Sequence, residues 1–171
     1  LEKNFLEILQ KNIINFKAEK VVASYCNFRR LIEGKKYSDV KILDNSSKPI
    51  LFDKKSFLLD YSEQKIRLIG VYGLINSQIL KKIQKEKKIG KPILINNKST
   101  GVHAYTDFIL PIKLNEYGKI VYQDIRLVNL DIRHDAISSR TVDYSSYLSS
   151  QYDAINIIFK IVKKLKNNKL E

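Results

Sequence analysis

Two long runs of β-type residues, 102–114 and 119–131, constrain the fold more than any other feature of the chain. They are separated by a polar connection that ends in Gly118, a residue able to take a positive φ. Short loops of this kind commonly join two antiparallel strands. The runs therefore predict a hairpin in which Leu114 pairs with Lys119, with a sheet built around it.

The predicted register gives this hairpin two unlike faces. One face reads as mainly a core face, because most of its side chains are apolar: Phe108, Leu110, Ile112, Val121, Gln123 and Ile125. The other face is polar and aromatic, and its candidate ligand-binding residues are Tyr105, Asp107, Tyr122, Asp124 and Arg126. Carboxylates could hold an amine, the arginine could hold a carboxylate, and the tyrosines could supply walls and hydroxyl donors. From spacing alone, an ordinary solvated pair between Asp107 and Arg126 is the simpler interpretation of this face.

The remaining segments predict an α+β fold in one domain of 171 residues. Residues 1–34 predict a long N-terminal helix, because apolar residues recur at spacings of three and four along the stripe Ile14, Ala18, Val21, Tyr25, Phe28 and Ile32. A sheet core is expected over residues 38–131, and a capping-box pattern at residues 150–153 opens a C-terminal helix over residues 150–169. Shorter elements are expected within the core: a hairpin over 39–52, a strand over 66–73, a helix over 74–89 and a strand over 91–95.

Basic residues outnumber acidic ones by 31 to 18, which gives a net charge of +13. This excess would suit binding to nucleic acid or to an anionic membrane surface. Only six of the basic residues are arginines, however. A protein that reads DNA grooves more often uses arginine, because its guanidinium group forms two hydrogen bonds to one base or phosphate. A chain this rich in lysine, isoleucine and asparagine also has the composition that an AT-rich genome produces. The sequence therefore predicts no nucleic-acid partner, and a basic module that binds nucleic acid or anionic membranes is the alternative.

Motifs of catalysis and metal binding are mostly absent. The two histidines, His103 and His134, are too far apart for a local ligand pair, and the single cysteine, Cys26, excludes an internal disulfide and a cysteine-built zinc site. No glycine-rich phosphate loop or nucleophile elbow occurs. Asp107 is expected to stay ionised beside Arg126, which makes it unsuited to acid catalysis. The sequence therefore predicts a protein that is not an enzyme and that uses no cofactor or metal.

Two stretches of the chain resemble a known family. Residues 39–51 (DVKILDNSSKPIL) look like a hydrophobic strand, an acidic turn and a second strand. Residues 109–113 (ILPIK) and 118–121 (GKIV) are similar to a strand ending in Pro-Ile, a glycine turn and the strand that follows. Over roughly residues 1–131 the chain thus resembles the extracytoplasmic sensor domains called Cache, or PDC, domains, which are PAS-like.

This resemblance implies a central antiparallel sheet with the long helix on one face and a ligand pocket on the other. It implies an extracytoplasmic, periplasmic domain of an inner-membrane receptor (a chemoreceptor, a histidine kinase or a cyclic-dinucleotide enzyme) whose first helix continues from a membrane span. It adds Tyr72 and Lys91 as ligand-binding candidates near the helical lid of the pocket. The expected ligand is a small molecule, for example an amino acid or a carboxylate, and the N-terminal helix could pair with its twin in a homodimer.

Overall fold

The computed structural model describes residues 1–32, 35–36, 47–86, 92–95, 98–103, 105–132 and 144–167. Helices and strands are mixed along the chain, so the α+β class that the sequence predicts is confirmed. In chain order the elements are α1 (Phe5–Asn15), β1 (Val21–Ile32), β2 (Lys35–Lys36), β3 (Ile50–Phe52), α2 (Lys54–Ser62), β4 (Gly73–Ile75), α3 (Ser77–Gln84), β5 (Pro92–Ile95), β6 (Lys98–His103), α4 (Thr106–Tyr117), β7 (Lys119–Ile132) and α5 (Tyr144–Asn167).

The main sheet has five strands, and its two longest strands, β1 and β7, lie side by side at the centre. They run parallel, from the pair Val21 and Lys119 to the pair Ile32 and Ile132. β3 pairs antiparallel with β7, while β2 and β4 pair antiparallel with β1. β5 and β6 form a separate antiparallel pair. The sheet is therefore mixed, and its parallel centre differs from the antiparallel sheet that the resemblance implies.

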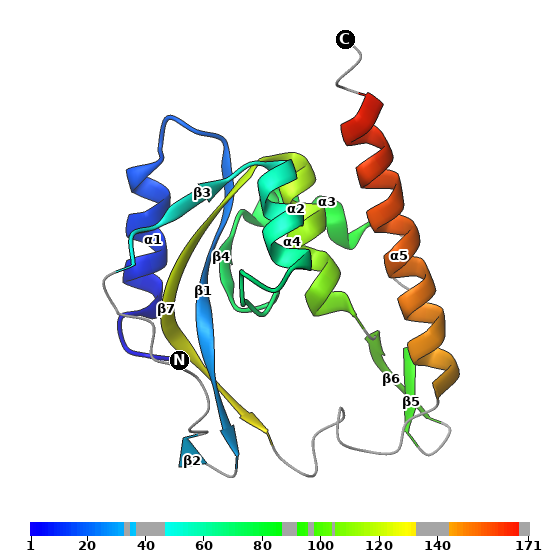
Figure 1. Ribbon diagram of the computed structural model, residues 1–171. Coiled ribbons are helices and arrows are strands. Elements are labelled where there is room, and N and C mark those ends of the chain that lie inside the picture. The colour runs from blue at the N-terminus through cyan, green and yellow to red at the C-terminus, as the bar shows by residue number, and fades with distance from the viewer. Residues whose placement is uncertain are drawn as a thin grey trace.

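Helices cover both faces of the sheet (Figure 1). α1 lies against one face, and α2 and α4 lie against the other. Successive side chains of β1 point to opposite faces of the sheet. Tyr25 therefore packs in the core beneath α2 and α4, whereas Cys26 packs with Phe5 of α1 on the other face. α5 lies on the outer side of α4 and joins the same core through buried residues such as Ala154.

The predicted long helix over residues 1–34 is wrong beyond its first half. α1 ends at Asn15, and residues 21–32 form β1. Residues 22–27 of β1 are all buried, because helices cover the sheet on both faces. A continuously buried run shows no period of two, so its apolar residues also fit a helical spacing. Residues 1–32 form no long helix, so the predicted homodimer through a long N-terminal helix loses its structural basis.

The predicted hairpin of residues 102–114 and 119–131 is wrong in its first half. The chain forms β6 up to His103 and then α4, and β7 pairs with β1 instead. Ile109 and Ile112, one helical turn apart, are both buried in the core. Gly118 has a φ of 172°, an extended conformation, so it is not in the positive-φ state expected of a hairpin loop. A Cβ there would lie 2.5 Å from the carbonyl oxygen of Lys20, so glycine permits a close approach of two backbones.

The shorter predicted elements and the C-terminal helix agree with the structure to different degrees. The helix predicted over residues 74–89 is confirmed at its centre as α3, whose N-cap Asn76 accepts hydrogen bonds from two backbone amides. The C-terminal helix is confirmed as α5 and begins earlier than predicted. β5 confirms the strand predicted over residues 91–95. Of the strand predicted over residues 66–73, only Gly73 enters a strand, and the first strand of the hairpin predicted over residues 39–52 lies outside the described residues.

Candidate functional site

The loop of residues 66–70 crosses the sheet face that α4 covers, and it contacts three elements. The hydroxyl of Tyr25, on β1, donates a hydrogen bond of 2.9 Å to the carbonyl oxygen of Gly70. The hydroxyl of Tyr122, on β7, lies 3.2 Å from the carbonyl oxygen of Arg67. The loop also lies so close to α4 that a Cβ at Gly70 would overlap the carbonyl oxygen of Asp107. The loop therefore connects the central strands to the first turn of α4.

A bulge in β7 lies next to this loop. Cys26 pairs with Gln123, but the next residue of β1, Asn27, pairs with Arg126, so two residues of β7 have no partner on β1. One of them is Asp124, whose Oδ1 accepts a hydrogen bond of 2.6 Å from Asn27 Nδ2. Bulges are common beside functional sites because they re-aim a side chain. Here the bulge aims a carboxylate toward a neighbouring strand.

Tyr122 and Asp124 interact directly. The Tyr122 hydroxyl lies 3.2 Å from Asp124 Oδ1 as well as from the Arg67 carbonyl oxygen, so its single proton can be donated to either acceptor. Burial raises the pKa of the Tyr122 phenol, and the nearby charge of Asp124 adds to the effect. Tyr122 therefore stays a neutral hydrogen-bonding group at physiological pH.

The start of α4 carries the second part of the site. Tyr105, the N-cap residue, has a φ of 61° and so lies in the left-handed region, which a bulky residue rarely adopts. Strained backbone of this kind clusters at ligand-binding sites. Asp107 lies in the first turn of the helix, close to the buried tyrosines Tyr25 and Tyr61. Tyr61 also stacks on Phe108, with ring centroids 5.1 Å apart.

Asp107 is a carboxylate in aromatic surroundings. Partial burial alone raises its pKa, and in the described part of the chain no lysine or arginine forms an ion pair with it. The pairing with Arg126 that the sequence predicts is therefore wrong, and so is the expectation that this arginine keeps Asp107 ionised. Burial also raises the pKa of Tyr61, and the charge of Asp107 raises it further. Asp107 is exposed to solvent, so its carboxylate is accessible to a molecule from outside.

The structure gathers most of the candidate residues that the sequence predicts, but on different elements. Tyr105 and Asp107 begin α4, whereas Tyr122 and Asp124 lie on β7, and the loop of residues 66–70 contacts both groups. Two further candidates lie at the edges of this region: Tyr72 follows the loop, and Arg126 pairs with Asn27. Lys91 lies outside the described residues. Sequence reasoning missed the contributions of Asn27, Tyr61 and Gly70, and it assigned Tyr25 to a helix.

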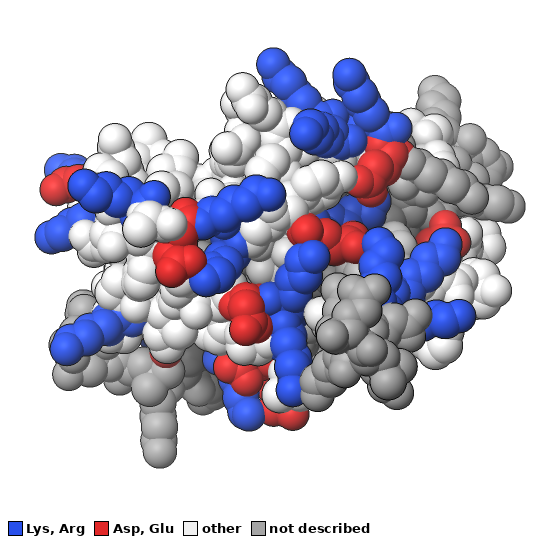
Figure 2. Space-filling model, turned by 90° about the horizontal axis from the view of Figure 1, so that it is seen from above, with Lys and Arg blue, Asp and Glu red and all other residues white. Residues whose placement is uncertain are grey.

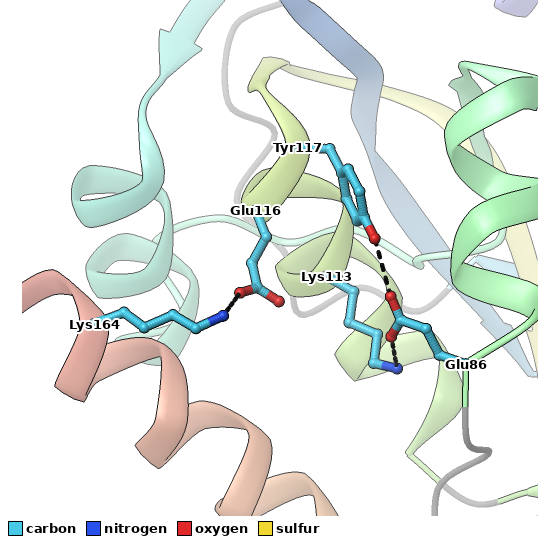
Figure 3. Close-up of polar contacts among 5 residues, drawn as sticks. All are labelled: Glu86, Lys113, Glu116, Tyr117 and Lys164. Atoms are coloured by element: carbon cyan, nitrogen blue, oxygen red, sulfur yellow. Dashed lines mark hydrogen bonds and ion pairs between the residues drawn. The ribbon is translucent and has the colours of Figure 1, made fainter.

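Polar contacts tie α4 to its neighbours (Figure 3). Glu86, which lies just after α3, contacts two residues of α4. Its Oε2 lies 2.6 Å from Lys113 Nζ, and its Oε1 lies 3.1 Å from the Tyr117 hydroxyl. Lys164 Nζ, on α5, lies 3.1 Å from Glu116 Oε1. The first turn of α4 therefore carries the candidate site, and residues nearer its C-terminal end contact α5 and the segment just after α3.

Three further observations bear on function. No helix in the described part of the chain is both long and apolar enough to cross a membrane. The described residues include no group of three or more histidines, cysteines, aspartates or glutamates placed to hold a metal ion. Comparison of the chain with protein-family models, with curated proteins and with solved structures gave no match. The resemblance to Cache domains thus depends on two short stretches. Residues 109–113, which it takes as part of a strand, lie in helix α4, and residues 39–46 lie outside the described residues, so the resemblance stays a prediction.

Proposed function

We propose that this chain is a sensor domain that binds a small ligand carrying a cationic amine, at the junction of the loop of residues 66–72 with the first turn of α4. The observation that carries the proposal is Asp107: a carboxylate without an ion-pair partner among the described residues, with a raised pKa, beside Tyr25 and Tyr61. An amine paired with Asp107 would offset the cost of its partial burial.

Two exposed tyrosines in the adjoining segments suit the same ligand chemistry. Tyr72 follows the loop and Tyr105 precedes the first turn of α4, and they are 40% and 39% exposed, so their rings are accessible to a molecule from solvent. A cation over a tyrosine face is attracted by the ring quadrupole, by roughly 0.5–1 kcal/mol at exposed sites. The carboxylate and the rings together favour an amine over a carboxylate ligand, which narrows the choice that the sequence leaves open.

The same helix offers a route from ligand to output. A ligand at the first turn of α4 would act on a helix that is joined to α5 through Glu116 and Lys164 and to the α3 end through Lys113 and Glu86 (Figure 3). A ligand changes such an arrangement only if it binds one arrangement better than another. In a sensor of this design, the shift of α4 would be transmitted through α5.

The resemblance to Cache domains extends the proposal to cellular architecture. By that likeness, the domain would lie outside the cytoplasmic membrane as part of a membrane-anchored receptor, such as a chemoreceptor, a histidine kinase or a cyclic-dinucleotide enzyme. The long N-terminal helix that suggested a direct continuation from a membrane span is absent, since α1 has 11 residues. This extension therefore depends on the motif stretches alone.

A thermal-shift screen against amines, amino acids, carboxylates and nucleobases tests the proposal. A saturable rise in the melting temperature with an amine-bearing compound is expected, and Asp107→Asn should abolish it. Asp60→Asn is the matched control, since Asp60 is an aspartate in α2 whose carboxylate pairs with Lys65 instead of lying unpaired like that of Asp107 among the described residues. Carboxylates that bind while amines do not, or amine binding that survives Asp107→Asn, would contradict the proposal.

The net charge of +13 favours a second candidate function, binding to nucleic acid or to an anionic membrane. Figure 2 weighs against a continuous basic surface on the face it shows, because acidic side chains are interspersed among the lysines and arginines. Lys113, Lys119 and Lys164 each pair with a glutamate. Binding to duplex DNA that falls steeply with salt concentration would support this second function, and its absence would count against it.

A further inference from the structure

The outer face of α5 carries a row of exposed apolar side chains. They are Leu148, Tyr152, Ile155 and Phe159, with exposed fractions of 64%, 68%, 58% and 68%. We refer to these four residues as the α5 stripe. Their spacings of four, three and four place them on one side of the helix, in the pattern of the a and d positions of a coiled coil. Scattered exposed apolar residues are ordinary, but an aligned row on one helix marks an interaction surface.

The α5 stripe is not needed to hold α5 on its own domain. The opposite side of the helix does this, through Ala154 and Ile161, which are 4% and 6% exposed, and through the partly buried Ile157, Ile158 and Leu165. α5 is also the outermost helix on its side of the molecule (Figure 1). The helix therefore has one apolar side in the core and a second, narrower apolar side directed to solvent.

The charges beside the α5 stripe indicate what would cover it. Phe159 is followed by Lys160 and Lys163, which are both exposed, and Lys163 lies one helical turn beyond it. Residues 154–167 contain four lysines and no aspartate or glutamate. Lys164 pairs with Glu116, whereas Lys160 and Lys163 form no ion pair among the described residues. A partner helix that covers Phe159 would therefore bring its flanking residues next to these two unpaired positive charges.

A second copy of this chain fits that surface poorly. Each copy carries a net charge of +13 and the same lysines, so two copies repel each other at long range. An acidic partner is attracted by the same field, and its carboxylates pair with the lysines. We propose that the α5 stripe is the docking site for an acidic partner protein, which presents an amphipathic helix with an apolar seam flanked by aspartates or glutamates.

Designed peptides provide the probe for this docking site. Two fluorescein-labelled peptides of about three heptads share leucine and isoleucine at the a and d positions. The acidic peptide has glutamate at the e and g positions, and the basic peptide has lysine there. Fluorescence anisotropy with the full chain should show that the acidic peptide binds at least about tenfold more tightly than the basic peptide, and that added salt weakens its binding.

Two double variants separate the stripe from the rest of the surface. Tyr152→Ser with Phe159→Ser should weaken binding of the acidic peptide at least about tenfold. Leu6→Ser with Leu59→Ser is the matched control, because both residues are apolar, are 62% and 51% exposed and lie on α1 and α2, and it should leave binding unchanged. Circular dichroism spectra check that each variant keeps its helices. Lys160→Glu with Lys163→Glu should reverse the preference, so that the basic peptide binds more tightly.

Several results would overturn the proposal. The first is failure of the acidic peptide to bind, or binding that the stripe variant leaves unchanged. The second is a dimer in sedimentation experiments that the stripe variant dissociates, which would assign the stripe to a second copy of this chain. The third is stripe-dependent binding to phosphatidylserine vesicles without binding to the acidic peptide, which would assign it to a membrane surface.

Discussion

The hydroxyl of Tyr25 donates a hydrogen bond of 2.9 Å to the carbonyl oxygen of Gly70 and so ties the central strand β1 to the loop above it. Tyr25 is completely buried, and its ring also lies against Gly73, where β4 begins. A side chain in this place links the sheet, the loop and the start of α4. The candidate site is therefore built on a core residue rather than on a surface loop alone.

Replacing Tyr25 with phenylalanine should destabilise the protein. The change keeps the ring but leaves the Gly70 carbonyl without its buried donor, which costs about 1–2 kcal/mol of the free energy of unfolding. Urea denaturation measures this loss. The control is Tyr152→Phe, at a tyrosine that is 68% exposed, and it should leave the free energy of unfolding unchanged. An equal effect of the two changes would contradict the contact described here.

Replacing Gly70 with alanine should damage both stability and ligand binding. The new Cβ would overlap the carbonyl oxygen of Asp107 and lie 2.8 Å from Cδ of Pro111, so the loop must move away from α4. Strain of this kind typically costs about 1–3 kcal/mol. Thermal unfolding measures the loss, and Val71→Ala, at an exposed neighbour, should change the melting temperature little. Normal stability of Gly70→Ala would show that the loop does not lie this close to the helix.

The sequence predicts the fold class and the outer elements well, because their signals are local. α3 has an asparagine cap and a lysine-rich last turn, and α5 has a long helical period. The centre of the sheet could not be predicted in the same way. Residues 22–27 are buried on both faces, so no alternation marks them as a strand, and their pairing with residues 119–126 joins segments about a hundred positions apart.

The candidate site shows the same division. The predicted hairpin register selects Tyr105, Asp107, Tyr122 and Asp124 as candidates, because it places them on one polar face. The expected geometry was wrong, because residues 106–117 have both the apolar content of a strand and a helical spacing of buried residues. Gly70 had no signal in the sequence, since its importance comes from how closely the loop approaches α4.

Replacing Asp107 with asparagine should raise stability while abolishing ligand binding. Burial raises the pKa of Asp107 in the folded state, so the folded protein favours the neutral carboxyl. Its stabilising contribution is fully present below the ordinary aspartate pKa of about 3.9 and is lost as the pH rises through the raised value. At neutral pH, Asp107→Asn should therefore raise the melting temperature, by about 2 °C or less because the side chain is partly exposed.

Melting curves at several pH values check this prediction about Asp107. The advantage of the asparagine variant over the native protein should grow as the pH increases from about 4 toward neutrality. Asp60→Asn, at a residue whose carboxylate pairs with Lys65, should give no such gain. A lower melting temperature for Asp107→Asn at neutral pH would mean that the carboxylate has a stabilising partner, and it would remove the main support for an amine-binding site.

The buried tyrosines should make the protein unstable in alkali. Burial raises the pKa values of Tyr25, Tyr61 and Tyr122 in the folded state, so unfolding releases phenols that ionise near their ordinary pKa of about 10. Their contribution to stability is therefore present below about pH 10 and is lost as the pH rises above it. Absorbance at the phenolate band should show the phenolates of Tyr25, Tyr61 and Tyr122 appearing together with unfolding.

Cys26 offers an independent measure of the same core. The thiol is buried between β1 and α1, and burial raises its pKa to about 11. It should react slowly with a disulfide reagent in the native protein at neutral pH, because both the thiolate and access to it are scarce. One thiol per chain should react on addition of denaturant, since Cys26 is the only cysteine. Rapid reaction of the native protein would contradict a β1 strand covered by α1, and with it the placement of Tyr25 on the opposite face.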